Sequence, residues 1–168
     1  LMNRGYAAGR YVKLIEEYRR IVPEGSVTTD IVVGFPSETD DDFQKTAVIL
    51  KTMMFDNAFI FKYSPRPPAK AAELADDVPE ETKTSRIEEL LKRQKEISLM
   101  RNEPMKGRIV EVLVDGKNKK STGVLSGRTR ANKTVVFSGD ESLIGTLIRV
   151  EIESASPYNL KGRNVGKI

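Results

Sequence analysis

Two short stretches of the sequence combine residue types that could bind a ligand, and the first is residues 34–39 (GFPSET). The apolar run before it, residues 31–33, is typical of a buried parallel strand. Ligands of α/β folds gather where such strands end, so a tight turn beginning at Gly34 could offer backbone N–H groups to a cofactor. Asp30 lies within the strand, where a carboxylate is costly to bury unless it is paired or faces a polar ligand. The other interpretation is that Asp30 caps a neighbouring element.

The second stretch is basic and covers residues 128–133 (RTRANK). Alternate residues of a strand point to the same side, so Arg128 and Arg130 share one face. Paired guanidinium groups suit phosphate oxygens and can stack on unpaired bases. Lys119 and Lys120 lie on the preceding loop and extend the basic region. The alternative is a solvated charged face that binds nothing.

Charge is distributed unevenly along the 168 residues. Residues 1–104 hold 16 Lys and Arg against 18 Asp and Glu, whereas residues 105–168 hold 12 against 6. The second part therefore carries a net charge of +6, which favours a polyanionic partner such as nucleic acid.

Composition excludes several classes of protein and site. The chain has no Cys and no His, which excludes disulfides, thiol nucleophiles, Ser-His-Asp triads, the common zinc sites and any Cys-ligated iron–sulfur cluster held by this chain alone. No apolar run reaches the roughly 18 residues of a membrane span. Nothing at the N-terminus resembles a signal peptide, so we expect a cytoplasmic protein. The helical pattern begins almost at Leu1, which suggests part of a longer protein.

Helix and strand alternate in the first part of the chain. Apolar residues recur at helical spacing over 11–22, strands are expected at 26–34 and 57–63, and Thr39 with Asp42 predicts a capped helix between them. This order is typical of parallel α/β architecture, and two strands make only part of a barrel. Residues 64–79 hold four prolines and form a linker or lid. One long helix from Glu80 to about Glu103 is expected to join two domains.

The last 64 residues predict a different class of fold. Short β-rich runs at 107–115, 122–130, 133–138, 144–154 and 158–163 are separated by Gly, Asp, Asn and Ser. Regular short strands of this kind indicate a small antiparallel barrel. Barrels of this size, especially OB-like ones, often bind nucleic acid on an open face.

Five ordered motifs resemble the radical S-adenosylmethionine methylthiotransferase family: residues 2–6 (MNRGY), 29–39 (TDIVVGFPSET), 61–67 (FKYSPRP), 76–81 (DDVPEE) and 126–133 (SGRTRANK). The resemblance covers nearly the whole chain. It implies the C-terminal portion of a partial (βα)6 barrel in residues 1–72, a linker and connecting helix in 73–104, and a TRAM domain, which is an OB-like antiparallel barrel, in 105–168.

The resemblance also implies cofactors and site residues. The family binds S-adenosylmethionine and two 4Fe–4S clusters, and uses a 5′-deoxyadenosyl radical to attach sulfur. By similarity, Arg4 would bind the methionine carboxylate of the cofactor and Asp30 its ribose or amino group. Gly34, Tyr63 and Ser64 would border the adenine. No residue of this chain is expected to be catalytic or to ligate a metal.

Within the family, the basic motif is similar to that of the tRNA-modifying branch, which adds a methylthio group to C2 of N6-isopentenyladenosine beside the anticodon. The partner implied is the anticodon stem-loop of tRNA. The expected RNA-binding residues are the basic and amide side chains of the barrel loops, namely Lys119, Lys120, Arg128, Arg130, Asn132 and Lys133.

The chain departs from the family pattern at three points. It lacks the cluster cysteines, so alone it should bind RNA without catalysing the reaction. Ser37 stands where Gly is usual, which is tolerable if its φ is negative, and residues 68–70 (PAK) replace the usual Gly-Thr-Pro. Two alternatives remain open, namely a ribosomal-protein methylthiotransferase, favoured if the face of residues 128–133 is covered, and a non-catalytic RNA-binding module.

Overall fold

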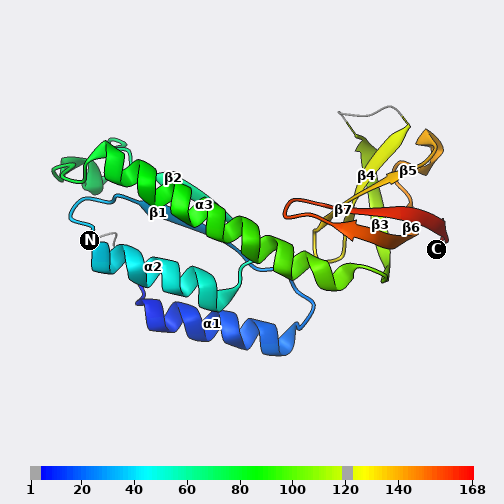
Figure 1. Cartoon of the computed structure of the whole chain (residues 1–168), viewed down its shortest axis with the longest axis horizontal. Coiled ribbons are helices and arrows are strands. Elements are labelled where there is room, and N and C mark those ends of the chain that lie inside the picture. Colours follow the sequence, from blue (N-terminus) through cyan, green and yellow to red (C-terminus); the bar gives the residue numbers. More distant parts are fainter. Residues whose placement is uncertain (1–4, 119–122) are drawn as a thin grey trace. The chain divides into compact units, whose positions relative to one another are not determined.

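The chain forms two compact units, residues 1–97 and 98–168, in the computed structural model, which describes residues 5–118 and 123–168 (Figure 1). The elements of the first unit are α1 (Ala8–Ile21), β1 (Thr28–Val33), α2 (Asp40–Met53), β2 (Asn57–Lys62), η1 (Lys70–Glu73) and most of α3 (Glu80–Asn102). Those that follow α3 are η2 (Glu103–Met105), β3 (Ile109–Lys117), β4 (Val124–Thr129), β5 (Thr134–Ser138), η3 (Glu141–Leu143), β6 (Leu147–Ala155) and β7 (Leu160–Lys167).

The first unit is a two-stranded parallel sheet with helices on one face. β1 and β2 pair in register from Thr28 opposite Asn57 to Val33 opposite Lys62. Alternate residues of β2, Ala58 and Ile60, are buried in one cluster with side chains of α1, α2 and α3. The expected parallel α/β arrangement is therefore confirmed.

The opposite face of this sheet is open. Asp30 is exposed and stands opposite Phe59 in the register, while Phe59 and Phe61 are 53% and 51% exposed. The expectation of a buried strand is therefore confirmed for one face of β1 only. A continuous apolar run indicates a strand of a parallel sheet, but it does not show whether one face or both faces of that sheet are covered by helices.

Helix α2 begins where the capping motif of Thr39 and Asp42 predicts. The Thr39 hydroxyl accepts a hydrogen bond from the Asp42 N–H at 3.2 Å, and the Asp42 carboxylate accepts one from the Thr39 N–H. This reciprocal arrangement satisfies two backbone donors that a helix N-terminus leaves without partners.

The long helix α3 has an unexpected buried stripe. Its buried positions include the apolar residues Leu90 and Ile97, but also Lys83 and Arg86, which lie two turns and one turn before Leu90. Leu91, although apolar and next to Leu90, is 49% exposed. In the described part of the chain, no helix is both long enough and apolar enough to cross a membrane.

The second unit contains a closed five-stranded barrel in the order β3-β4-β5-β7-β6. All neighbouring pairs are antiparallel except β5 and β7, which run parallel with Val135 opposite Leu160. The predicted small barrel is confirmed, but a fully antiparallel one is ruled out by parity. Strands that alternate in direction around a closed ring must be even in number, so five strands require at least one parallel pair.

Candidate functional site

In the turn after β1, backbone N–H groups are hydrogen-bonded to other atoms of the same turn. Gly34 has a φ of +69°, and a Cβ there would lie 2.3 Å from the Lys83 Cγ, so only glycine fits. Its N–H donates to the Glu38 carboxylate at 2.6 Å. The Glu38 N–H donates to the Phe35 carbonyl. The expectation that this turn offers free N–H groups is therefore wrong at Gly34 and Glu38.

Arg86 of α3 holds the same carboxylate from the other side. Its guanidinium donates to Glu38 Oε2 at 2.7 Å and to the Glu38 carbonyl at 3.2 Å, and the two side chains are only 7% and 10% exposed. A second guanidinium nitrogen donates to Asp40 at 2.6 Å. The guanidinium also lies over the Phe43 ring. One buried arginine thus links the turn to the first residues of α2.

Ser37 is the strained residue of the turn. Its φ of +67° lies in the left-handed region, so the negative value that would make serine tolerable is not observed. Asp77 of the linker compensates by accepting from the Ser37 N–H at 2.7 Å. That backbone hydrogen bond is the main reason why the pKa of Asp77 is lowered from its ordinary value.

Tyr63 and the linker are held by a second buried cation. Lys83 is 3% exposed, and its ammonium contacts both oxygens of Asp76 at 2.5 and 2.7 Å. The Tyr63 hydroxyl donates to the Ala71 carbonyl at 2.6 Å, and its ring packs against Phe35 and under the Lys83 ammonium. Tyr63 is thus used internally, whereas Ser64 beside it is exposed.

Asp30 is available to a ligand. Its carboxylate is exposed on the open face of the sheet and has no hydrogen bond or ion pair with any residue that the structure describes. It therefore caps no neighbouring element in that part of the chain. Arg4, the other expected ligand of the cofactor, lies outside the described residues.

The basic hairpin between β4 and β5 exposes both of its arginines. The side chains of Arg128 and Arg130 are 48% and 85% exposed. Each lies near a carboxylate of β3, Arg128 3.4 Å from Asp115 and Arg130 2.5 Å from Glu111. Both guanidinium groups thus lie beside β3. Arg130 follows the end of β4 and Asp115 lies at an irregularity of the β3–β4 register, so strand alternation alone does not place the two arginines on one face.

Asn132 and Lys133 shape this hairpin. Asn132 has a φ of +58°, which asparagine tolerates in tight turns. The Lys133 ammonium donates to the Asn102 side-chain oxygen at 2.8 Å, and the Asn102 amide nitrogen donates to the Ser156 carbonyl at 2.8 Å. Buried Asn102 thus joins the β4–β5 hairpin to the connection between β6 and β7. Lys119 and Lys120 lie outside the described residues.

Sequence reasoning missed Lys83, Arg86 and Asn102, although a signal existed for two of them. Lys83 and Arg86 continue the helical spacing of the buried stripe toward the start of α3, so charged residues occupy positions where burial is expected. No equivalent signal exists for Asn102.

The described residues contain no group of three His, Cys, Asp or Glu side chains that could hold a metal ion.

Comparison with known proteins places these features in context. Residues 103–165 match the TRAM domain family. The chain is 46% identical over 161 residues to the tRNA-2-methylthio-N(6)-dimethylallyladenosine synthase of Carboxydothermus hydrogenoformans. The aligned region covers 96% of the chain and 37% of that relative. It is 46% identical over 165 residues to the synthase of the same name from Moorella thermoacetica, covering 98% and 37%.

A third synthase of that name, from Pelotomaculum thermopropionicum, is 47% identical over 161 residues, covering 96% of the chain and 36% of the relative. The chain thus spans little more than a third of the length of the curated relatives it matches. The match of residues 103–165 to the TRAM domain family, together with the identity over 96% and 98% of the chain, confirms the resemblance to the methylthiotransferase family along nearly the whole chain.

Proposed function

We propose that this chain belongs to a cytoplasmic tRNA methylthiotransferase that adds a methylthio group to C2 of N6-isopentenyladenosine beside the anticodon. The observation that carries the proposal is the 46% identity to the synthases, which extends through both units rather than through the barrel alone. In this proposal the first unit borders the S-adenosylmethionine site and the barrel binds the anticodon stem-loop.

Asp30 is the residue that best fits S-adenosylmethionine. An exposed carboxylate without a partner in the described chain can accept hydrogen bonds from ribose hydroxyls or an amino group. Phe59, opposite it on the open face, adds an exposed aromatic surface. Arg4 would bind the cofactor carboxylate, and Ser64 would border the adenine through its exposed side chain. Gly34 and Tyr63 are buried and their N–H groups donate to Glu38 and Val33, so they would border the adenine only by shaping the pocket around it. When bound, the cofactor supplies the 5′-deoxyadenosyl radical.

An iron–sulfur cluster does not fit the residues of this chain, because the sequence has no cysteine. The contribution of residues 1–168 is therefore binding and positioning, and the chain alone should bind RNA without modifying it.

RNA binding by the barrel is supported by charge and exposure. The part of the chain from residue 105 onward carries a net charge of +6, and the two arginines of the hairpin are exposed rather than covered. Their carboxylate partners do not prevent phosphate binding, because exposed ion pairs contribute little to stability and can exchange. Exposure of this face favours tRNA over the ribosomal-protein alternative. Lys119, Lys120, Asn132 and Lys133 complete the proposed surface.

Binding of an unmodified anticodon stem-loop, measured over a salt series with a structured competitor RNA, tests the proposal. Replacing Arg128 and Arg130 by Ala should lower the log–log salt slope by about 1.4 to 1.8, the contribution of two phosphate contacts. The matched control replaces two exposed lysines of α2, Lys45 and Lys51, and should leave the slope unchanged.

Each outcome of this experiment separates the candidate functions. Preference for the stem-loop over the competitor supports tRNA recognition by this chain. An unchanged slope in the double arginine variant would mean that these side chains do not contact phosphate. Absence of RNA binding at low salt would refute the RNA assignment and favour a methylthiotransferase that acts on a protein.

A further inference from the structure

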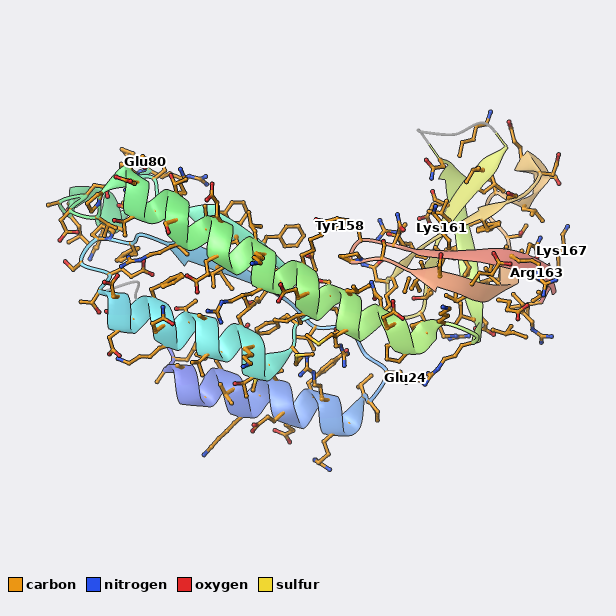
Figure 2. All side chains as sticks on the ribbon, viewed as in Figure 1. Glu24, Glu80, Tyr158, Lys161, Arg163 and Lys167 are labelled. Carbon is orange, nitrogen blue, oxygen red and sulfur yellow. The ribbon has the colours of Figure 1, made fainter. Side chains whose placement is uncertain are left out.

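Tyr158 is the most exposed large hydrophobic side chain in the described part of the chain, with 76% of its surface accessible. Burying an aromatic ring is among the larger favourable contributions available to a small domain, and a ring that the fold leaves exposed keeps its surface available for a partner. Figure 2 shows Tyr158 at the tip of the connection between β6 and β7.

The turn that carries Tyr158 is rigidly hydrogen-bonded. The Ser156 hydroxyl accepts from the N–H groups of Tyr158 and Asn159 at 3.3 and 3.0 Å, and it donates to the Asn159 carbonyl at 2.9 Å. The Ser156 N–H donates to the same carbonyl. A ring held on such a turn loses little conformational entropy when it binds a partner.

Topology places Tyr158 at the same end of the barrel as the basic hairpin. Because β5 and β7 run parallel with Val135 opposite Leu160, the connections that precede these two strands emerge side by side. Asn102 contacts both connections, accepting from Lys133 and donating to the Ser156 carbonyl. The exposed ring and the arginine pair therefore belong to one continuous end of the second unit.

Lys161 is an available cation on the strand that follows this ring. It is exposed on β7 three residues after Tyr158, and its ammonium has no ion pair with any described residue. Arg163 on the same strand differs, because its guanidinium contacts Glu151 at 2.5 Å. Both side chains and Tyr158 are labelled in Figure 2. A phosphate could thus bind Lys161 without displacing a carboxylate of the described chain.

We propose that Tyr158 is a stacking platform for an unpaired base of the bound RNA, with Lys161 contacting an adjacent phosphate. Stacking on an aromatic ring and neutralisation of the backbone are the two elements of single-stranded nucleic-acid recognition. The inference rests on the proposed RNA-binding function and adds a base-contacting residue to it. An anticodon loop offers such unpaired bases, which a purely electrostatic surface could not distinguish from other polyanions.

Substitutions of Tyr158 in the full chain test the inference. Tyr158→Ala should weaken binding of the unmodified anticodon stem-loop about 10-fold, within the range measured for loss of one stacked base, and Tyr158→Phe should bind like the parent chain. The salt slope should stay the same in both variants, because the ring neutralises no phosphate. Leu147→Ala is the control, since Leu147 is 48% exposed at the opposite end of β6.

Two probes separate stacking from charge. Inorganic polyphosphate carries the negative charge without bases, so Tyr158→Ala should not change its binding. Tyr158→Trp introduces the only tryptophan of the chain, and its fluorescence should be quenched by the stem-loop but not by polyphosphate.

Parent-like RNA affinity of Tyr158→Ala, together with unquenched Trp fluorescence in an RNA-bound chain, would overturn the inference and leave the proposed function intact. An equal loss of affinity for RNA and for polyphosphate in Tyr158→Ala would also overturn it, because the substitution would then have disrupted the charged surface rather than removed a stacking contact. Absence of RNA binding by the parent chain would refute both the inference and the proposed function.

Discussion

Substitution of Arg86 tests which contacts stabilise the turn of residues 34–39 in the first unit. Arg86→Met keeps an apolar stem beside Phe43 but removes the charge. Among the described residues, the Glu38 carboxylate, 10% exposed, is then left with the Gly34 N–H as its donor. Removing one partner of a buried ion pair costs about 3 to 5 kcal/mol. Because Glu38 keeps one hydrogen bond, we expect the lower end, a loss of about 3 kcal/mol in the free energy of unfolding.

Urea titration followed by far-ultraviolet circular dichroism measures this loss, since α1, α2 and most of α3 lie in the first unit. The double variant Arg86→Met with Glu38→Gln should be more stable than Arg86→Met, because glutamine can still accept from Gly34 without burying an unpaired charge. The control is Lys45→Met, which removes an exposed ion pair with Asp41 and should have little effect. A loss below about 1 kcal/mol in Arg86→Met would refute the view that Glu38 is desolvated.

Two further predictions concern the same turn and its neighbour. Ser37→Gly should raise the free energy of unfolding by up to about 1 kcal/mol, because glycine relieves the left-handed strain at φ +67°; a decrease in urea titration would mean that the Ser37 side chain stabilises the turn. The pKa values of Asp77 and Asp42 are lowered, mainly by the Ser37 N–H and the Thr39 hydroxyl. Their contribution to stability is therefore complete above about pH 4, the ordinary range of aspartate, and is lost as the pH falls through their lower folded values. Titrations over pH should show a shallower acid loss in Asp77→Asn, and an unchanged acid limb would contradict the assignment.

Local patterns were sufficient to predict most elements of the fold. Thr39 and Asp42 predicted the start of α2 because a capping box depends only on residues three apart. The strands of the barrel lie close to their predicted ranges, since Gly, Asp, Asn and Ser between apolar runs are a local signal.

Features that depend on distant partners could not be predicted in this way. Arg86 is buried only because Glu38 and Asp40, more than forty residues earlier, surround it. Ser37 adopts a left-handed backbone that Asp77 stabilises from the linker. Of the expected site residues, Asp30 is exposed as a cofactor ligand requires, whereas Tyr63 is committed to Ala71 through its hydroxyl.

The arrangement of the proposed RNA surface follows from strand number. An odd-stranded closed barrel must contain a parallel pair, and here that pair is β5 and β7. Parallel neighbours start at the same end, so the connections before them are brought together although more than twenty residues separate them in sequence. The first connection carries Arg130 and follows Arg128 near the end of β4, and the second carries Tyr158. In an even barrel of alternating strands, every neighbouring pair would start at opposite ends. The parallel pair that the strand count imposes on the fold is therefore what can place a stacking ring beside a phosphate-binding hairpin.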